Sequence, residues 1–194
     1  QEAVAAAAQV ISELPPLPPG VPPHRIEHCS ECPPEVLDVV RRSGAAVVTQ
    51  PGFIYWNGPS YRANVAESLQ PHLYPIGALV AAGINAAFGS DASVINPNPW
   101  TAIHSAATRQ DYKTQTFPES NGSVRVSVQS ALRMYTLSGA EVEGTAQNKG
   151  SIASGKLADM VLVDANPLKV GTDELKDIKA KMTMVGGQVV WEGL

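Results

Sequence analysis

Three short apolar runs, set among segments with helical periodicity, constrain the fold more than any other feature of this sequence. The runs are HRIEHC, AAVVTQ and INAAFGSD, which begin at His24, Ala45 and Ile84. Strands that alternate with helices pair in parallel, because a right-handed crossover returns the chain to the start of the next strand. The pattern therefore predicts an α/β fold built on a parallel sheet.

Four segments around these runs carry apolar residues at the spacing of a helix: residues 1–14, 33–44, 70–83 and 98–110. Gly44 and Gly83 end two of them, as is common at a helix C-terminus. The first segment reads as a helix already under way, so we expect the chain to begin within a domain. Residues 15–23 are dense in proline and predict a surface loop, and residues 51–62, which mix aromatic residues with glycine and proline, predict another.

The character of the chain changes in its last quarter. After a polar loop at residues 111–125, Ser127 is expected to cap a helix over residues 128–144. From about residue 148, short β segments separated by glycines follow, and VGGQ between two valine-rich runs predicts a hairpin. We therefore divide the chain into an α/β portion, residues 1–147, and a small β appendage, residues 148–194.

Composition and charge argue against nucleic acid and membranes as partners of this protein. Asp and Glu outnumber Lys and Arg by 18 to 14 without a basic stripe, so nucleic acid is not an expected partner. The longest nearly uncharged apolar run, residues 76–89, is too short to span a membrane. We expect a soluble protein with no membrane partner, and two cysteines read as free thiols favour the cytoplasm.

Two strand ends carry candidate catalytic or metal-binding residues, because reactive groups in parallel sheets stand at the carboxyl ends of strands. If HRIEHC is extended, His28 points to the same side as His24 and Ile26 and lies at the carboxyl end, where a neutral imidazole can bind Zn²⁺ or a similar divalent ion. Asp91 follows the third strand and can touch a metal and take a proton from bound water. Each has an ordinary alternative: His28 as a hydrogen-bonded strand-end histidine, and Asp91 as an Asx-turn or cap residue.

Cys29 and Cys32 offer a competing interpretation as part of a zinc knuckle or a redox pair. A structural zinc site usually needs four protein ligands, and no second Cys or His pair lies nearby in the sequence. Pro33 and Pro34 also break the helix that a thioredoxin-like motif would begin.

Aromatic residues on the predicted loop after the second strand form a further candidate. Tyr55 and Trp56 can wall a substrate pocket, or they can pack on their own neighbours. His72 and His104 have no partner nearby in the sequence, so we expect surface or packing roles for them.

Five stretches occur in the order seen in the carboxyl half of one superfamily: HRIEHCS, FGSDASVINPNPWTAIHSAATR, SALRMYTLSGAEVEG, KGSIASGKLADMVLVDANPL and MVGGQVVWEG. The chain resembles the amidohydrolase superfamily, and within it the amidohydrolase-3 branch, which includes N-substituted formamide deformylases and N-acyl-amino-acid deacylases. The resemblance spans nearly the whole chain. It implies a TIM barrel with a small β-sandwich, and hydrolysis of amide-type bonds at a mono- or binuclear metal centre.

The resemblance also implies roles for individual residues. The family ligands are a His-x-His after the first strand, a carboxylate or modified lysine after the fourth, histidines after the fifth and sixth, and an aspartate after the eighth. Matched motif by motif, the sixth-strand histidine falls on His28 and the eighth-strand aspartate on Asp91. His24, Cys29 and Cys32 then become bystanders. The implied cofactor is a divalent metal, zinc by preference, and the implied substrate is a small molecule with an amide-type bond.

One departure from the family pattern concerns the missing ligands. The sequence has no His-x-His, and no predicted strand before residue 23 that carries the remaining ligands. A TIM barrel needs about 250 residues. We therefore expect this chain to contain barrel strands six to eight and part of the sandwich. A missing N-terminal half or a complementary chain would complete the barrel, and a homo-oligomer is a further option. Two alternatives stay open: a non-catalytic scaffold or binding protein derived from such a barrel, and a zinc or redox module at Cys29 and Cys32.

Overall fold

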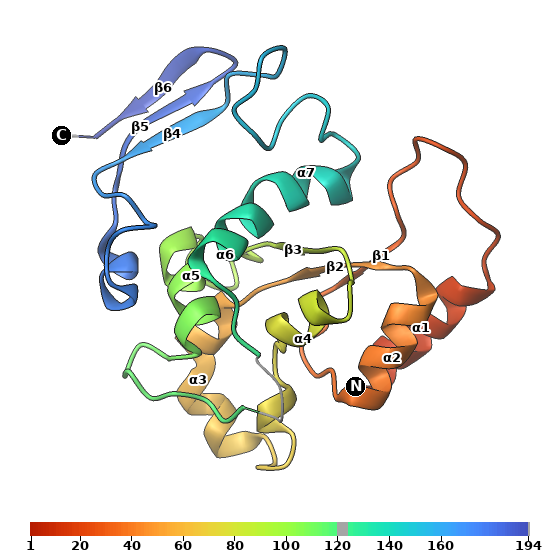
Figure 1. Ribbon diagram of the computed structural model, residues 1–194. Helices are drawn as coiled ribbons and strands as arrows, with labels where there is room; N and C mark the ends of the chain where they lie inside the picture. Colours follow the sequence, from red (N-terminus) through yellow and green to blue (C-terminus); the bar gives the residue numbers. More distant parts are fainter. Residues whose placement is uncertain (120–123, 194) are drawn as a thin grey trace.

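A computed structural model describes residues 1–119 and 124–193 of the chain, and a parallel sheet lies at its centre (Figure 1). The strands of this sheet, in spatial order, are β1 (Arg25–Glu27), β2 (Ala46–Thr49) and β3 (Ala86–Phe88). Ile26 pairs with Val47, and Val47 pairs with Ala86, in parallel register. The predicted α/β class and the predicted parallel pairing are confirmed.

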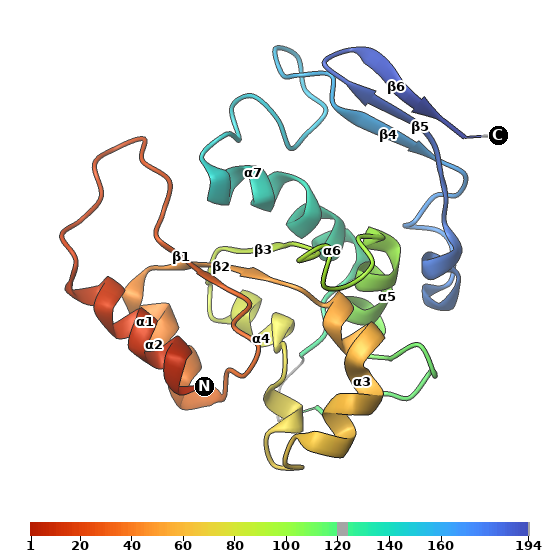
Figure 2. The same ribbon diagram turned by 180° about the vertical axis from the view of Figure 1, so that it is seen from behind.

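The two faces of the parallel sheet are covered by different helices. Val47 lies in the main core beneath the sheet, and the helices on that side are α1 (Glu2–Glu13), α2 (Pro34–Ser43) and α4 (Ile76–Ala81). Ala46 points the other way and is covered by Val142 of α7 (Leu137–Glu143). Figures 1 and 2 show α1, α2 and α4 on one side of the sheet and α7 on the other.

Helices α1 and α2 lie where periodicity places them, as does α5 (Pro99–Thr108). Gly44 ends α2 in the left-handed conformation, with φ of 69°, which glycine adopts without the steric penalty of a Cβ. The side chain of Asn98 accepts a hydrogen bond from the backbone N–H of Trp100 (3.0 Å) and thereby caps α5.

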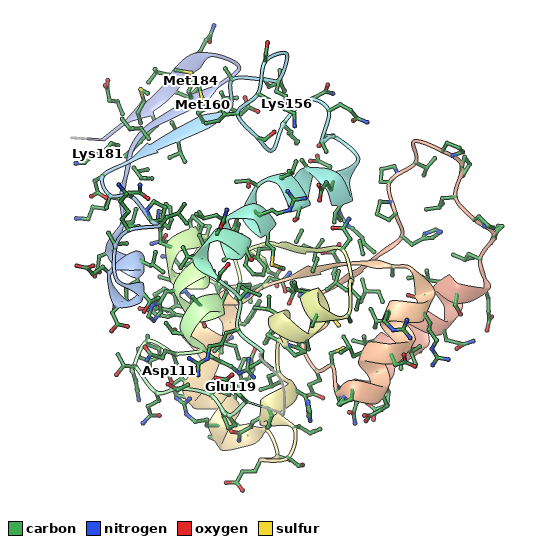
Figure 3. The ribbon with its side chains drawn as sticks, in the orientation of Figure 1. Asp111, Glu119, Lys156, Met160, Lys181 and Met184 are labelled. Atoms are coloured by element: carbon green, nitrogen blue, oxygen red, sulfur yellow. The ribbon has the colours of Figure 1, made fainter. Side chains whose placement is uncertain are left out.

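The aromatic segment after β2 is a helix, α3 (Gly52–Asn64), so the predicted loop is wrong. Its glycines are there for packing. A Cβ on Gly58 would lie 2.5 Å from the Cβ of Asp111, so only glycine lets the segment after α5 come this close. Asp111, which is fully buried, forms an ion pair with Arg62 of α3, and Figure 3 places Asp111 beside that helix.

Pro59 lies inside α3, and the structure compensates for the hydrogen bond that it cannot make. Because proline has no N–H, the carbonyl of Tyr55 lacks its usual intrahelical donor. That carbonyl accepts a hydrogen bond from the backbone N–H of Tyr112 instead (3.0 Å). The contact with residues 111–112 therefore stabilises α3, although the glycine and proline residues of that helix disfavour helical structure.

Two other predicted helices are shorter than expected. Within residues 70–83, a 3₁₀ turn, η1 (Gln70–His72), precedes α4, because Tyr74 adopts a left-handed backbone with φ of 44° and interrupts the helix. The helix predicted over residues 128–144 is divided into α6 (Val128–Tyr135) and α7 by Thr136, whose φ and ψ are −120° and −91°.

Ser127 caps α6 as predicted, since its hydroxyl accepts a hydrogen bond from the N–H of Ser130 (3.1 Å). Residues 120–123, which belong to the predicted polar loop, and residue 194 lie outside the described part of the chain. None of the helices in the described part is long and apolar enough to cross a membrane.

The C-terminal segment forms a second, antiparallel sheet of β4 (Met160–Val163), β5 (Ala180–Val185) and β6 (Gln188–Glu192). Gly186 and Gly187 connect β5 to β6 with φ of 57° and 81°, which confirms the predicted hairpin. Met160 and Met184 pair across β4 and β5, and Figure 3 shows them on the sheet well away from α3.

Most of this second sheet is solvent-exposed, with Val161 56% and Trp191 48% exposed. By contrast, Leu175 of the 3₁₀ helix η2 (Thr172–Asp177) is fully buried in the main core, where η2 packs on α5. Part of the predicted β appendage thus shares the core of the α/β portion. The division at residue 147 stays a prediction.

Candidate functional site

The carboxyl ends of the three parallel strands meet at one edge of the sheet, and each is followed by a polar side chain. His28 follows β1, Gln50 follows β2, and Asp91 comes three residues after the end of β3. Hydrogen bonds continue past the strands themselves: the N–H of His28 donates to Val48 (2.8 Å), and the N–H of Gly89 donates to Thr49 (3.0 Å). The middle strand therefore holds both outer strands in place at this edge.

The backbone turns sharply at His28. The strand ends at Glu27, and His28 and Cys29 adopt left-handed conformations with φ of 67° and 49°. The predicted alternation is wrong here, because the turn moves His28 away from the side of Ile26. Ile26 and Cys29 are buried in the main core, whereas His28 is exposed at the edge of the sheet.

Gln50 holds the imidazole of His28. Its Oε1 lies 3.0 Å from Nδ1 of His28, and its Nε2 donates to the carbonyl of Val48 (3.3 Å). The Gln50 side chain is only 3% exposed, so its amide is fixed by these partners rather than by water. His28 as a whole is exposed, and its other ring nitrogen, Nε2, has no hydrogen-bond partner within the described residues.

Asp91 presents a carboxylate at the same edge from the other side of β2. Its backbone is left-handed, with φ of 54°, and its carbonyl accepts a hydrogen bond from the N–H of Val94 (2.8 Å). Within residues 1–119 and 124–193, no donor bonds to its carboxylate, so the turn is closed by the backbone and not by the side chain. An Asx-turn would need a hydrogen bond to the side chain of Asp91, so the described residues do not support that alternative; a catalytic role stays a prediction.

Two tyrosines, Tyr61 and Tyr74, lie together, and the charge of Asp91 acts on one of them, Tyr74. The hydroxyls of Tyr61 and Tyr74 lie 3.3 Å apart, and the ring of Tyr74 stacks on Phe53. Burial, helped by the hydrogen bond to Tyr61 and by the negative charge of Asp91, raises the pKa of Tyr74. Tyr74 therefore stays a neutral phenol at physiological pH.

Cys29 and Cys32 are free thiols in the core, 0% and 2% exposed. A hydrogen bond between them, together with burial, raises the pKa of the Cys32 thiol. A thiol that keeps its proton is a poor metal ligand and a poor nucleophile. The same hydrogen bond lowers the pKa of the Cys29 thiol. Both side chains pack in the main core, and among the described residues no group of three or more His, Cys, Asp and Glu side chains could hold a metal ion.

The predicted pocket aromatics lie on α3, and one of them, Tyr55, packs against α5. The ring of Tyr55 meets the ring of His104 edge to face (centroids 5.9 Å apart) and also contacts Trp56 (5.0 Å). Trp56 is 37% exposed. Contact with substrate stays a prediction for both residues.

His104 and His24 lie away from the candidate site, and the surface or packing role of His72 stays a prediction. His104 is buried, and its Nδ1 donates to the carbonyl of Thr172 (2.8 Å), which ties α5 to η2. This confirms a packing role for His104, with a partner that is distant in the sequence. His24 precedes β1 and so lies at the opposite end of that strand from His28; it borders a small hollow beside Leu14 and Gly44.

Comparison with known proteins identifies the family. Residues 2–191 match the model of an amidohydrolase family, that of the amidohydrolase-3 branch. The chain belongs to the amidohydrolase family. Its curated relatives include the Bacillus subtilis protein YtcJ, which is 27% identical over 168 residues, and the N-substituted formamide deformylase of Arthrobacter pascens, which is 28% identical over 151 residues.

These relatives are much longer than the chain. The aligned parts cover 87% of the chain but 32% of YtcJ, and 77% of the chain but 27% of the deformylase. Solved structures give the same picture: a metal-dependent hydrolase from Pyrococcus horikoshii has a TM-score of 0.69 at 23% identity over 89% of the chain and 34% of its own. An adenosine deaminase from Xanthomonas campestris, with bound zinc, has a TM-score of 0.58 at 24% identity over 84% of the chain and 36% of its own.

An amidohydrolase metal centre needs more ligands than this edge supplies. Among the described residues, no group of three or more His, Cys, Asp and Glu side chains is placed to hold a metal ion. Catalytic zinc sites use three protein ligands. The ligand chemistry of His28 and Asp91 suits a divalent ion, since one is an imidazole with a free ring nitrogen and the other a carboxylate without a hydrogen-bond donor. The described residues thus offer two of the ligand types that such a site uses, and their role as metal ligands stays a prediction.

A cavity of about 1100 Å³ lies on the face of the sheet that α7 covers, bordered by Val48, Ala87, α6, α7 and the segment before β4. His28 and Asp91 are not among its lining residues. We give the strand ends priority over this larger hollow, because reactive groups in parallel sheets gather at the carboxyl ends.

The sequence interpretation missed Gln50. The available signal was its position, directly after the apolar strand residues AVVT and before Pro51, at the carboxyl end of the central strand. A polar residue at that point in a buried strand has to find a hydrogen-bond partner, and the neighbouring strand end offers His28.

Proposed function

We propose that the chain is the C-terminal part of a metal-dependent amidohydrolase that cleaves a non-peptide carbon–nitrogen bond in a small amide-type substrate. The observation that carries the proposal is the position of two groups after the carboxyl ends of β1 and β3, the outer strands of one parallel sheet: an exposed histidine whose Nδ1 contacts Gln50, and a carboxylate without a hydrogen-bond donor among the described residues. Family membership supports the reaction class. The name of the A. pascens relative supports the substrate class.

In this proposal, His28 and Asp91 are two ligands of a divalent ion, zinc by preference, because imidazole and carboxylate groups both bind zinc. The bound ion would polarise the substrate carbonyl and lower the pKa of a water molecule. Asp91 would accept a proton from the water on a carboxylate oxygen as the water oxygen bonds to the carbonyl carbon, and would give that proton to the nitrogen as the carbon–nitrogen bond breaks. His28 holds the ion through Nε2, while Gln50 occupies its other ring nitrogen.

We further propose that β1, β2 and β3 correspond to strands six to eight of a (β/α)₈ barrel, and that β4, β5 and β6 belong to a small β-sandwich. Within the described residues, β1 and β3 are edge strands that each have one neighbour. Open edges and exposed apolar residues such as Val161 and Trp191 favour further pairing. A missing N-terminal half or a complementary chain would cover these surfaces and supply the remaining ligands; homo-oligomerisation stays an option.

Metal removal and reconstitution of the full-length protein test the proposal. The protein is stripped with a chelator and assayed for amine release from a panel of N-substituted formamides and N-acyl amines, before and after zinc is added. We expect hydrolysis of at least one of these substrates, lost on stripping and restored by zinc. A protein that binds no divalent ion and hydrolyses none of the panel would instead support the scaffold alternative.

A further inference from the structure

The hydrogen bond between His28 and Gln50 has a direction that the surrounding groups determine. A backbone carbonyl can only accept hydrogen bonds, so the end of the Gln50 amide that faces the carbonyl of Val48 (3.3 Å) must be its NH₂ group. The other end, which faces Nδ1 of His28 (3.0 Å), is therefore the amide oxygen. Since that oxygen can also only accept, Nδ1 of His28 must carry the proton.

A proton on Nδ1 leaves a lone pair on Nε2 of the neutral ring. In water, the opposite tautomer of a histidine side chain predominates, with the proton on Nε2 and no lone pair there. The hydrogen bond to Gln50 thus selects the form of His28 that can bind a metal through its exposed nitrogen.

The position of Gln50 is rigid enough for this task. The carbonyl of Val48 accepts both the backbone N–H of His28 (2.8 Å) and the side chain of Gln50 (3.3 Å), so one strand-end carbonyl fixes the two partners together. A Cβ at Gly89, the residue after β3, would be 3.7 Å from the Gln50 nitrogen, so the end of the neighbouring strand lies against the amide. The left-handed backbone of His28 is unfavourable for a non-glycine residue and is maintained only where neighbouring groups fix it.

We propose that Gln50 is a positioning residue that fixes His28 as the Nδ1–H tautomer and so makes Nε2 the metal-binding atom. The tautomer follows from the contacts within this chain. What Nε2 binds rests on the proposed function.

Nitrogen NMR on the metal-free, full-length protein tests the tautomer directly. Histidine is labelled with ¹⁵N, and the signals of His28 are identified by their loss in His28→Gln. We expect Nδ1 of His28 to be protonated in the wild type, and the ring to shift toward the Nε2–H form in Gln50→Leu. Gln50→Glu retains an acceptor at this position and should keep the Nδ1–H form.

Gln70→Leu is the matched control, because Gln70 is also a buried glutamine whose side chain donates to backbone carbonyls, here those of Arg62 and Val65. It should leave the His28 tautomer unchanged. A wild-type His28 protonated on Nε2, or a tautomer unaffected by Gln50→Leu, overturns the proposal. Should Gln50→Leu fail to fold, the wild-type and Gln50→Glu spectra still decide the matter.

Metal affinity separates failure of this proposal from failure of the proposed function. Loss of a residue that orients a ligating histidine typically lowers metal affinity by about 10- to 100-fold. We expect a loss of that size in Gln50→Leu, measured by competition with a chromophoric zinc chelator, and little change in Gln70→Leu. A tautomer that responds as expected in a protein that binds no zinc would uphold the role of Gln50 and refute the metal site.

Discussion

Replacement of Asp91 by Asn removes the proposed proton acceptor and one anionic metal ligand, while it keeps the size of the side chain and the backbone conformation. Asp91 has a left-handed backbone with φ of 54°, and Asn is one of the few other residues that adopt this conformation readily. Alanine at this position would add a backbone strain of roughly 1–2 kcal/mol. The carbonyl hydrogen bond from Val94 does not involve the side chain, so Asp91→Asn keeps it.

The expected loss of activity follows from the role of the carboxylate. General acid–base catalysis typically contributes about 10²- to 10⁴-fold to the rate. At about 1.36 kcal/mol for each factor of ten, this is roughly 3–5 kcal/mol of transition-state stabilisation. Stability should change little, because no described donor binds the carboxylate of Asp91 in the folded state.

The assay compares kcat/KM of wild-type and Asp91→Asn full-length protein on the best substrate of the formamide panel, with zinc content measured on the same samples. Thermal unfolding of both proteins controls for folding. Glu67→Gln, the same change from a carboxylate to an amide at another exposed residue, is the matched control, and we expect it to keep activity within a few-fold of the wild type. Wild-type turnover in a well-folded, zinc-loaded Asp91→Asn protein would refute the assignment of Asp91 as the proton acceptor.

Three further predictions concern packing, pH and metal content. Gly58→Ala should lower the free energy of unfolding by about 1–3 kcal/mol, measured by denaturant titration, because the new Cβ collides with Asp111. Burial, with help from a hydrogen bond, raises the pKa of Tyr74 in the folded state. The stability that this shift contributes is present below the ordinary tyrosine pKa of about 10 and is lost as the pH rises above that value. Tyr74→Phe should therefore flatten the fall in unfolding free energy at alkaline pH. His28→Ala should lower zinc stoichiometry, whereas Cys32→Ser should not; equal loss in both would favour the zinc-knuckle alternative.

The strands, and the helices with clear end signals, could be predicted from sequence because local chemistry determines them. Helix α5 has a capping residue at Asn98 and a proline at its first position, and Gly44 stops α2. The aromatic helix α3 could not be predicted. Its glycine and proline read locally as turn signals, whereas the contacts that justify them come from residues 111–112, which are remote in the sequence.

The candidate site shows the same division. That His28 and Asp91 stand at strand ends followed from the strand positions alone. The direction of His28 did not, because the left-handed turn at residues 28 and 29 breaks the alternation of side chains along the strand. The role of Gln50 required knowledge of which strand lies beside β1, and this depends on the tertiary pairing of β1 with β2.

Anomalous X-ray diffraction at the zinc edge, from crystals of the zinc-loaded full-length protein, tests the central claim most directly. The account predicts a zinc peak at about 2.0–2.1 Å from Nε2 of His28, with a carboxylate oxygen of Asp91 at the same centre and Nδ1 still bonded to Gln50. A zinc peak at the sulfur atoms of Cys29 and Cys32, or a fully loaded protein with no peak beside His28, would contradict it.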